Sequence, residues 1–162
     1  MSGGELDAVR EGERVVGAVP APDVGLVFIG TVRTPFVTRA DCPRQGRPDG
    51  PPCALVLHEP WVPAAAGLEA YDALEVLYWL DRSRRDLLTQ RPRAGGPLHG
   101  TLSLRSPNRP NPIGTSIVRL ERVEGGTLHV RGLDCIDGTP LVDVKPDRCP
   151  YVPLAPPKAA DR

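Results

Sequence analysis

The chain lacks any long hydrophobic segment. In its 162 residues no stretch approaches the roughly 18 uncharged apolar residues that a membrane-spanning helix needs. The first residues are rich in glutamate and aspartate and contain no apolar core, so a secretory signal is not expected either. We therefore expect a soluble, cytoplasmic protein that does not contact a membrane.

Sequence that favours helices is also scarce. The chain has 20 prolines and 17 glycines, and both residue types resist the interior of an α-helix. A helix bundle or a long coiled coil is therefore excluded. Apolar residues still make up 40% and the net charge is zero, which argues against a disordered chain. The length suits one domain with short tails.

Motifs for metals and nucleotides are absent. The four cysteines, at 42, 53, 135 and 149, show no C-x-x-C spacing, and no histidine lies at a zinc-ligand distance from them. We therefore expect free thiols and no metal. The chain contains neither G-x-G-x-x-G nor G-x-x-x-x-G-K-[ST], so neither a Rossmann nucleotide fold nor a P-loop is indicated.

Lysine is nearly absent, since 18 of the 20 basic residues are arginine. Although the whole chain is neutral, the segment from Arg82 to Arg122 contains nine arginines and two acidic residues, a net charge of +7 that the rest of the chain balances. Such asymmetry suits a polyanionic partner. The alternative is a set of solvated arginines on several faces.

Short β-branched runs bounded by glycine and proline predict a mainly β domain. We expect a flexible N-terminal tail at 1–23, one domain at 24–152 and a C-terminal tail at 153–162. Few helices are expected, at 63–70 and 81–88, so the pattern predicts an antiparallel barrel or sandwich. The predicted strands are 25–33, 54–58, 74–80, 99–104, 113–123, 127–133 and 141–145.

Three segments have the composition of ligand-binding loops. The densest, 104–116, has three prolines in six residues, which predicts a stiff loop that presents arginine and asparagine side chains. The second, 134–146, contains the turn sequence Asp-Gly-Thr-Pro. The third is Cys-Pro-Arg-Gln at 42–45. The last two, taken singly, also fit an ordinary turn and a solvated loop.

Four aromatic side chains are candidates for stacking on nucleic-acid bases, namely Trp61, Tyr71, Tyr78 and Trp79. Tyr78 and Trp79 belong to the longest apolar run, which favours core positions for both. His99 is a candidate general base, although a barrel position beside Gly100 is the better interpretation.

The order and spacing of five segments resemble the TrmO family, also called YaeB-like or TsaA-like. These segments are Pro-Arg-Gln at 43–45, Gly-Leu-Glu-Ala at 67–70, Arg-Pro-Arg with Gly-Gly at 91–96, Arg-Ser-Pro-Asn-Arg-Pro-Asn-Pro-Ile-Gly at 105–114, and Asp-Gly-Thr-Pro-Leu-Val-Asp-Val-Lys-Pro at 137–146. The resemblance implies a single β-barrel that binds S-adenosyl-L-methionine and a homodimer with its active site near the subunit interface. It implies methylation of N6 of threonylcarbamoyladenosine at position 37 of tRNA.

The resemblance and the basic segment together imply a set of site residues. No catalytic residue is identified. The expected cofactor contacts are Pro43, Arg44, Gln45, Asp81, Arg82, Arg105, Asp137, Gly138, Thr139 and Pro140. The expected substrate contacts are Arg84, Arg85, Asn108, Arg109 and Asn111.

The chain also departs from the family pattern. Asp81-Arg82 replace the His-Gln with which relatives often end the central strand, and Asp147 follows Lys145-Pro146 where tyrosine is usual. These changes weaken the substrate assignment more than the cofactor assignment. Two alternatives stay open: a small-molecule methyltransferase on the same barrel, and a non-catalytic module that binds S-adenosyl-L-methionine or RNA.

Overall fold

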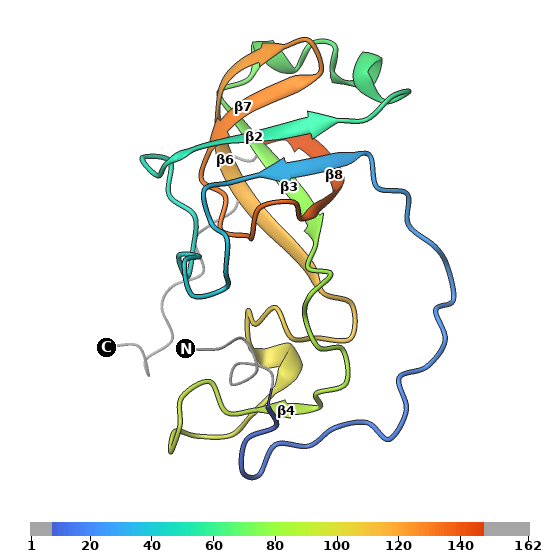
Figure 1. Ribbon diagram of the computed structural model, residues 1–162, viewed down its shortest axis with the longest axis vertical. Helices are drawn as coiled ribbons and strands as arrows, with labels where there is room; N and C mark the ends of the chain where they lie inside the picture. The colour runs from blue at the N-terminus through green and yellow to red at the C-terminus, as the bar shows by residue number, and fades with distance from the viewer. Residues whose placement is uncertain (1–7, 148–162) are drawn as a thin grey trace.

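Six short antiparallel strands close into a barrel in the computed structural model, which describes residues 8–147 (Figure 1). Their order around the barrel is β1-β2-β7-β6-β3-β8, and β8 pairs back to β1. The strands are β1 (Gly30–Arg33), β2 (Pro52–Leu57), β3 (Ala73–Trp79), β6 (Ile113–Glu124), β7 (Thr127–Arg131) and β8 (Pro140–Pro146). The predicted mainly β fold and antiparallel barrel are confirmed.

Alternation along each strand creates the core. In β3, Leu74, Val76 and Tyr78 are buried, and the residues between them are half-exposed. Successive side chains point to opposite faces of a strand, so one apolar set fills the barrel. Its other fully buried members are Val32, Leu55, Val118, Leu128, Val130, Leu133 and Leu141.

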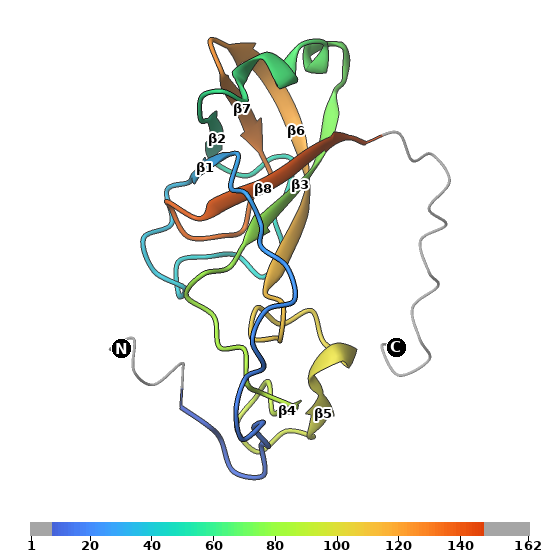
Figure 2. The ribbon, with the colours of Figure 1, turned by 90° about the vertical axis from the view of Figure 1, so that its right-hand side faces the viewer.

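A smaller unit, residues 84–104, lies beyond the end of the barrel where β3 and β6 meet (Figure 2). We call it the hairpin module. It contains the two-stranded sheet of β4 (Thr89–Gln90) and β5 (His99–Gly100), followed by the 3₁₀ turn η3 (Thr101–Ser103). Two more 3₁₀ turns, η1 (Val62–Ala65) and η2 (Leu68–Ala70), confirm the helical segment predicted at 63–70. No helix within 8–147 has the length and apolar character to cross a membrane.

The structure corrects three predicted elements. The strand predicted at 25–33 is shorter, because β2 ends at Leu57 and the backbone hydrogen bonds to neighbouring segments stop at Ile29, which still bonds to Leu141 and His58. The strand predicted at 99–104 is only β5 plus η3, and it lies outside the barrel. No helix forms at 81–88, because the backbone of 86–88 bonds to residues 14–16 in an extended pairing.

Part of the predicted N-terminal tail is attached to the hairpin module. Residues 10–16, which we call the N-terminal strap, exchange backbone hydrogen bonds with 86–89. The domain boundaries otherwise stay a prediction. The C-terminal tail predicted at 153–162 lies outside the described residues.

Gly114, in the proline-rich segment, leaves room for an aromatic ring that a larger residue at this position would meet. It pairs directly with Tyr78 across β3 and β6, and a Cβ built on Gly114 would lie 2.1 Å from Cε2 of the Tyr78 ring. The ring therefore covers the glycine, as aromatic residues do in other sheets.

We expect Gly114→Ala to lower the free energy of unfolding by about 1–3 kcal/mol, because the added methyl group overpacks the core. Urea denaturation would measure the loss. Gly100→Ala is the matched control, since the φ of Gly100 is −62° and no atom lies within 4 Å of the place its new methyl group would take. Equal stability losses in the two variants would contradict the packing explanation.

Candidate functional site

The Asp-Gly-Thr-Pro turn is fastened to the end of β1. Val32 donates its N–H to the Thr139 carbonyl at 2.8 Å, and Gly138 donates to the Val32 carbonyl at 2.9 Å. The Asp137 carboxylate accepts the Thr34 N–H at 3.0 Å and lies 3.4 Å from Nε of Arg33. The Asp137 side chain is thus already used within the fold.

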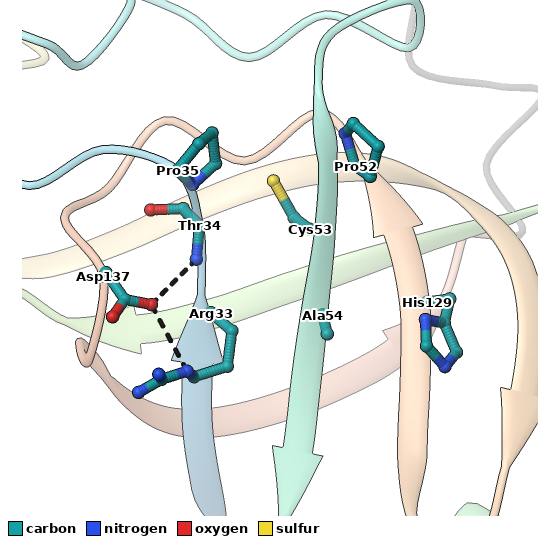
Figure 3. Close-up of a pocket in the computed structure, with 8 residues that line it drawn as sticks. All are labelled: Arg33, Thr34, Pro35, Pro52, Cys53, Ala54, His129 and Asp137. Carbon is teal, nitrogen blue, oxygen red and sulfur yellow. Dashed lines mark hydrogen bonds and ion pairs between the residues drawn. The ribbon is translucent and has the colours of Figure 1, made fainter.

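Two hollows flank this turn. The larger, about 440 Å³, opens on the outer wall between β1, β2 and β7, and Asp137 is its one predicted cofactor residue (Figure 3). Arg33 and His129 stand on either side of the small Ala54. The smaller hollow, about 30 Å³, brings together Asp81, Arg82 and Thr139, three predicted cofactor residues from two separate segments. The smaller hollow therefore matches the predicted site better.

A buried polar cluster lies inside the same end of the barrel. The Tyr78 hydroxyl contacts Oγ of Ser116 at 2.8 Å and donates to the Asp134 carboxylate, and Ser116 donates to Asp134 at 3.2 Å. Burial, and then the negative charge of Asp134, raise the pKa of Tyr78 well above its usual value. Tyr78 is therefore a neutral donor at physiological pH. Its predicted core position is confirmed.

The loop that carries Pro43, Arg44 and Gln45 packs beside this cluster. Gly46 lies directly against the backbone of Gly132, where a Cβ would approach the Gly132 carbonyl oxygen to 1.7 Å. Burial and the nearby Asp134 carboxylate raise the pKa of the Cys42 thiol to about 11. The pKa of Cys135 is also raised, mainly by burial.

Both thiols are therefore protonated at physiological pH. Within 8–147 no cluster of three or more His, Cys, Asp or Glu side chains has a metal-binding arrangement.

The proline-rich loop is anchored through Asn108. This residue is buried, and its Oδ1 accepts the Arg84 N–H at 3.2 Å. Its carbonyl accepts Nε2 of the buried Gln90 at 2.6 Å. Arg109 folds back onto the carbonyls of Leu104 and Ser106. Both predicted substrate residues are thus occupied in holding the loop, whereas the side chains of Arg105 and Asn111 are exposed.

Arg84 and Arg85, predicted as a pair, have different environments. Arg84 forms a two-point ion pair with Asp86, at 3.0 and 2.7 Å. Arg85 stacks over Trp79, 5.5 Å from the ring centroid, and its Nε donates to the Pro110 carbonyl at 2.7 Å. Trp79 therefore faces outward, and its predicted core position is wrong, because it alternates with the inward-facing Tyr78.

Several predicted residues share a different property, which is that their polar groups are free. Within the part of the chain described, no hydrogen bond or ion pair engages the side chains of Arg44, Gln45, Asp81, Arg82, Arg105 and Asn111. Arg82 follows β3, and Asn111 precedes β6, whose ends pair through Trp79 and Ile113. The free side chains of Arg82 and Asn111 therefore lie at the same end of the barrel.

The basic segment does not form one patch. Arg119 and Arg122 pair with Glu121 and Glu124 toward the far end of β6, near its hairpin with β7. Arg91 donates to main-chain carbonyls. The net charge of +7 therefore overstates the positive charge available at the site.

Sequence reasoning missed Asp134, Ser116 and Gln90 as site-supporting residues. Gln90 stands between Thr89 and Arg91, and Ser116 stands between Thr115 and Ile117, so nothing in the local sequence distinguishes either residue from its polar neighbours. Asp134, however, stands three residues before Asp137 in a segment already singled out, and an acidic residue that is half-buried there needs hydrogen-bond donors.

Comparison with known proteins gives consistent matches. The family model described as the tRNA-methyltransferase O N-terminal domain matches residues 31–154. A probable S-adenosyl-L-methionine-binding protein, VirR of Rhizobium radiobacter, is 53% identical over 148 residues, covering 91% of this chain and 85% of that protein. A mouse tRNA (adenine(37)-N6)-methyltransferase is 41% identical over 83 residues, covering 49% of this chain and 19% of that protein.

A solved structure agrees with the fold. The crystal structure of TrmO from P. aeruginosa superposes with a TM-score of 0.63 at 32% identity and covers 90% of this chain. The chain spans about three fifths of that protein, 62% of its length.

The contacts of Asp137 predict a structural role for its carboxylate. We expect Asp137→Ala to lower the free energy of unfolding by about 1 kcal/mol, because the Thr34 N–H loses its charged acceptor at a side chain that is 34% exposed. Asp81→Ala is the control, since no hydrogen bond or ion pair within the described residues engages that carboxylate. Chemical denaturation measures both, and an unchanged Asp137→Ala variant would contradict this role.

Proposed function

Because the chain belongs to the family of tRNA-methyltransferase O N-terminal domains, we propose that it is an S-adenosyl-L-methionine-dependent tRNA methyltransferase. The names of its relatives support both parts, since VirR is named for binding the cofactor and the mouse protein for methylating adenine 37 of tRNA. The proposed acceptor atom is N6 of threonylcarbamoyladenosine at that position.

One observation carries the proposal. The predicted residues with free polar groups come from segments far apart in the chain. Two of them, Asp81 and Arg82, line one hollow with Thr139, whose hydroxyl donates to the Ile136 carbonyl within its own turn. Buried polar groups elsewhere in the described residues are satisfied, so these free groups are not required by the fold. Polar side chains that the fold does not use are the ones available to a ligand.

The charges present fit the cofactor. S-adenosyl-L-methionine carries a carboxylate, an ammonium group and a sulfonium, and its activated methyl group is what it supplies to the reaction. Arg44 or Arg105 would bind the carboxylate, and Asp81 would stabilise one of the two positive charges. The fixed Thr139 turn would orient the rest.

The hollow that contains Asp81 and Thr139 does not by itself enclose a whole cofactor. Binding pockets for ligands of this size have volumes of roughly 300–1,000 Å³, and the hollow that contains Asp81 and Thr139 has about 30 Å³. A second copy of the chain would complete the site, which is why the homodimer belongs to the proposal. Two-fold symmetry is the commonest arrangement for such assemblies, and sedimentation equilibrium measures it.

Positioning is the main contribution expected of the protein. Transfer of a methyl group is an in-line displacement, and holding both reactants in a near-attack geometry contributes about 7–11 kcal/mol. The nitrogen must also lose a proton. His99 lies in β5 of the hairpin module and not in the barrel, and no described residue is assigned as the base.

Two observations favour a small-molecule substrate as the alternative. The net charge of the chain is zero, and ion pairs engage Arg84, Arg119 and Arg122, which leaves few free arginines. The test below separates the two.

The direct test supplies purified protein with the labelled cofactor and tRNA from a strain that lacks this methyl group. We expect mass spectrometry of the nucleosides to show N6-methylated threonylcarbamoyladenosine. A tRNA with an unmodified adenine 37 is the control. Cofactor binding without methylation of any tRNA would overturn the tRNA proposal and leave the small-molecule alternative.

Arg84 and Arg85 provide a matched pair of variants. We expect Arg85→Ala to raise the KM for tRNA and reduce the salt dependence of binding, because a fixed guanidinium with free terminal nitrogens is lost. Arg84→Ala should mainly reduce stability, because Asp86 loses its partner. Steady-state kinetics and thermal denaturation measure the two effects, and equal KM changes would contradict the distinction.

A further inference from the structure

The hairpin module is too small to hold its own shape. Its two strands have two residues each, Thr89–Gln90 and His99–Gly100. Even a complete two-stranded hairpin is marginally stable in water, and a third strand or a packed partner is needed. The N-terminal strap, which precedes the family-matched region that begins at residue 31, is in position to supply it.

The strap runs alongside the module as an added strand. Leu88 donates its N–H to the Arg14 carbonyl at 2.7 Å, and Val16 donates to the Asp86 carbonyl at 2.8 Å. Val15 forms a bridge with Leu87. Both ribbon views show the dark blue strap beside β4 (Figures 1 and 2).

Glu13 is the centre of the contact. Its carboxylate accepts the Arg10 N–H at 2.8 Å and the Arg91 N–H at 2.6 Å, which joins strap to module. The Arg91 guanidinium returns to the strap by donating to the Glu11 carbonyl at 3.1 Å. The side chain of Glu11 itself contacts no described residue.

From the strap a continuous set of contacts leads to the proline-rich loop. Arg14 donates its N–H to Oγ1 of Thr89 at 2.8 Å. The next residue, Gln90, donates to Oγ1 of Thr101 at 3.0 Å and to the Asn108 carbonyl at 2.6 Å. Asn108 lies between Arg105 and Asn111, whose side chains are free.

We propose that the N-terminal strap is the third strand of the hairpin module and that Glu13 is a positioning residue for the substrate loop 105–111. The identity of the substrate rests on the proposed function. The set of hydrogen bonds that joins the strap to the loop 105–111, which we call the mechanical link, does not. The strap therefore extends the functional unit beyond the family domain.

Hydrogen exchange on the full-length protein tests the link without any substrate. We expect Glu13→Ala to increase exchange in the peptides covering 86–111 by about tenfold or more, since two charged hydrogen bonds are lost. Glu13→Gln, which keeps one acceptor, should give an intermediate increase. Glu11→Ala removes the same charge and should match the wild type. Unchanged exchange in 86–111, or an equal increase in the barrel strands, would overturn the link.

Kinetics test the positioning role. We expect Glu13→Ala to raise the KM for tRNA several-fold at a temperature where the variant is fully folded, with S-adenosyl-L-methionine affinity unchanged and partial rescue by Glu13→Gln. An unchanged KM despite faster exchange would overturn positioning. A wild-type protein inactive on every tRNA would refute the proposed function instead, and exchange in 105–111 would still decide the mechanical link.

Discussion

Closure of the barrel between β1 and β8 is the constraint on which the site depends. β1 and β8 pair through only two pairs of facing residues, Gly30 with Leu141 and Thr31 with Pro140. Beyond these pairs the main chains stay joined through Val32 and Thr139, and through Phe36 and Asp137. The contacts that close the barrel therefore also fix the Asp-Gly-Thr-Pro turn. A ligand that binds this turn meets a backbone that cannot move without opening the barrel.

The sequence predicted the strands in which apolar residues alternate with others, because this alternation shows by itself which side of the strand packs in the core. Leu74, Val76 and Tyr78 predict a strand because the barrel interior needs an apolar residue at every second position. The wrong predictions concern backbone whose partner is distant in sequence. Residues 86–88 bond to 14–16, and no local pattern announces such a pairing. Trp79 was misplaced because an apolar run does not reveal which members alternate outward.

The segments predicted to form the site contain residues of two kinds, and the sequence did not separate them. Asn108, Arg109 and Asp137 lie in the predicted segments, but their side chains hold the loops together. For the arginines of the basic segment, a spacing rule would have identified some of the side chains that the fold already uses. Residues i and i+2 of an extended chain lie on one side, and the sequence places an acidic residue two positions after each of three arginines in the basic segment. These pairs are Arg84–Asp86, Arg119–Glu121 and Arg122–Glu124, and all three form ion pairs.

The barrel and the hairpin module carry different parts of the proposed site. The N-terminal strap, which lies outside the family-matched region, therefore affects the site through the module. Groups expected to bind the cofactor, such as Asp81 and Thr139, lie at or beside strand ends and inherit the rigidity of the closed barrel. Arg85 and the loop that carries Arg105 lie in or beside a unit with two-residue strands. The relative position of the expected cofactor-binding groups and the expected substrate-binding groups decides whether both sets reach one substrate. Since strands of two residues cannot order the module by themselves, the strap's hydrogen bonds to 86–91 contribute to that geometry, together with the contacts of Arg85 to Trp79 and of Gln90 to Asn108.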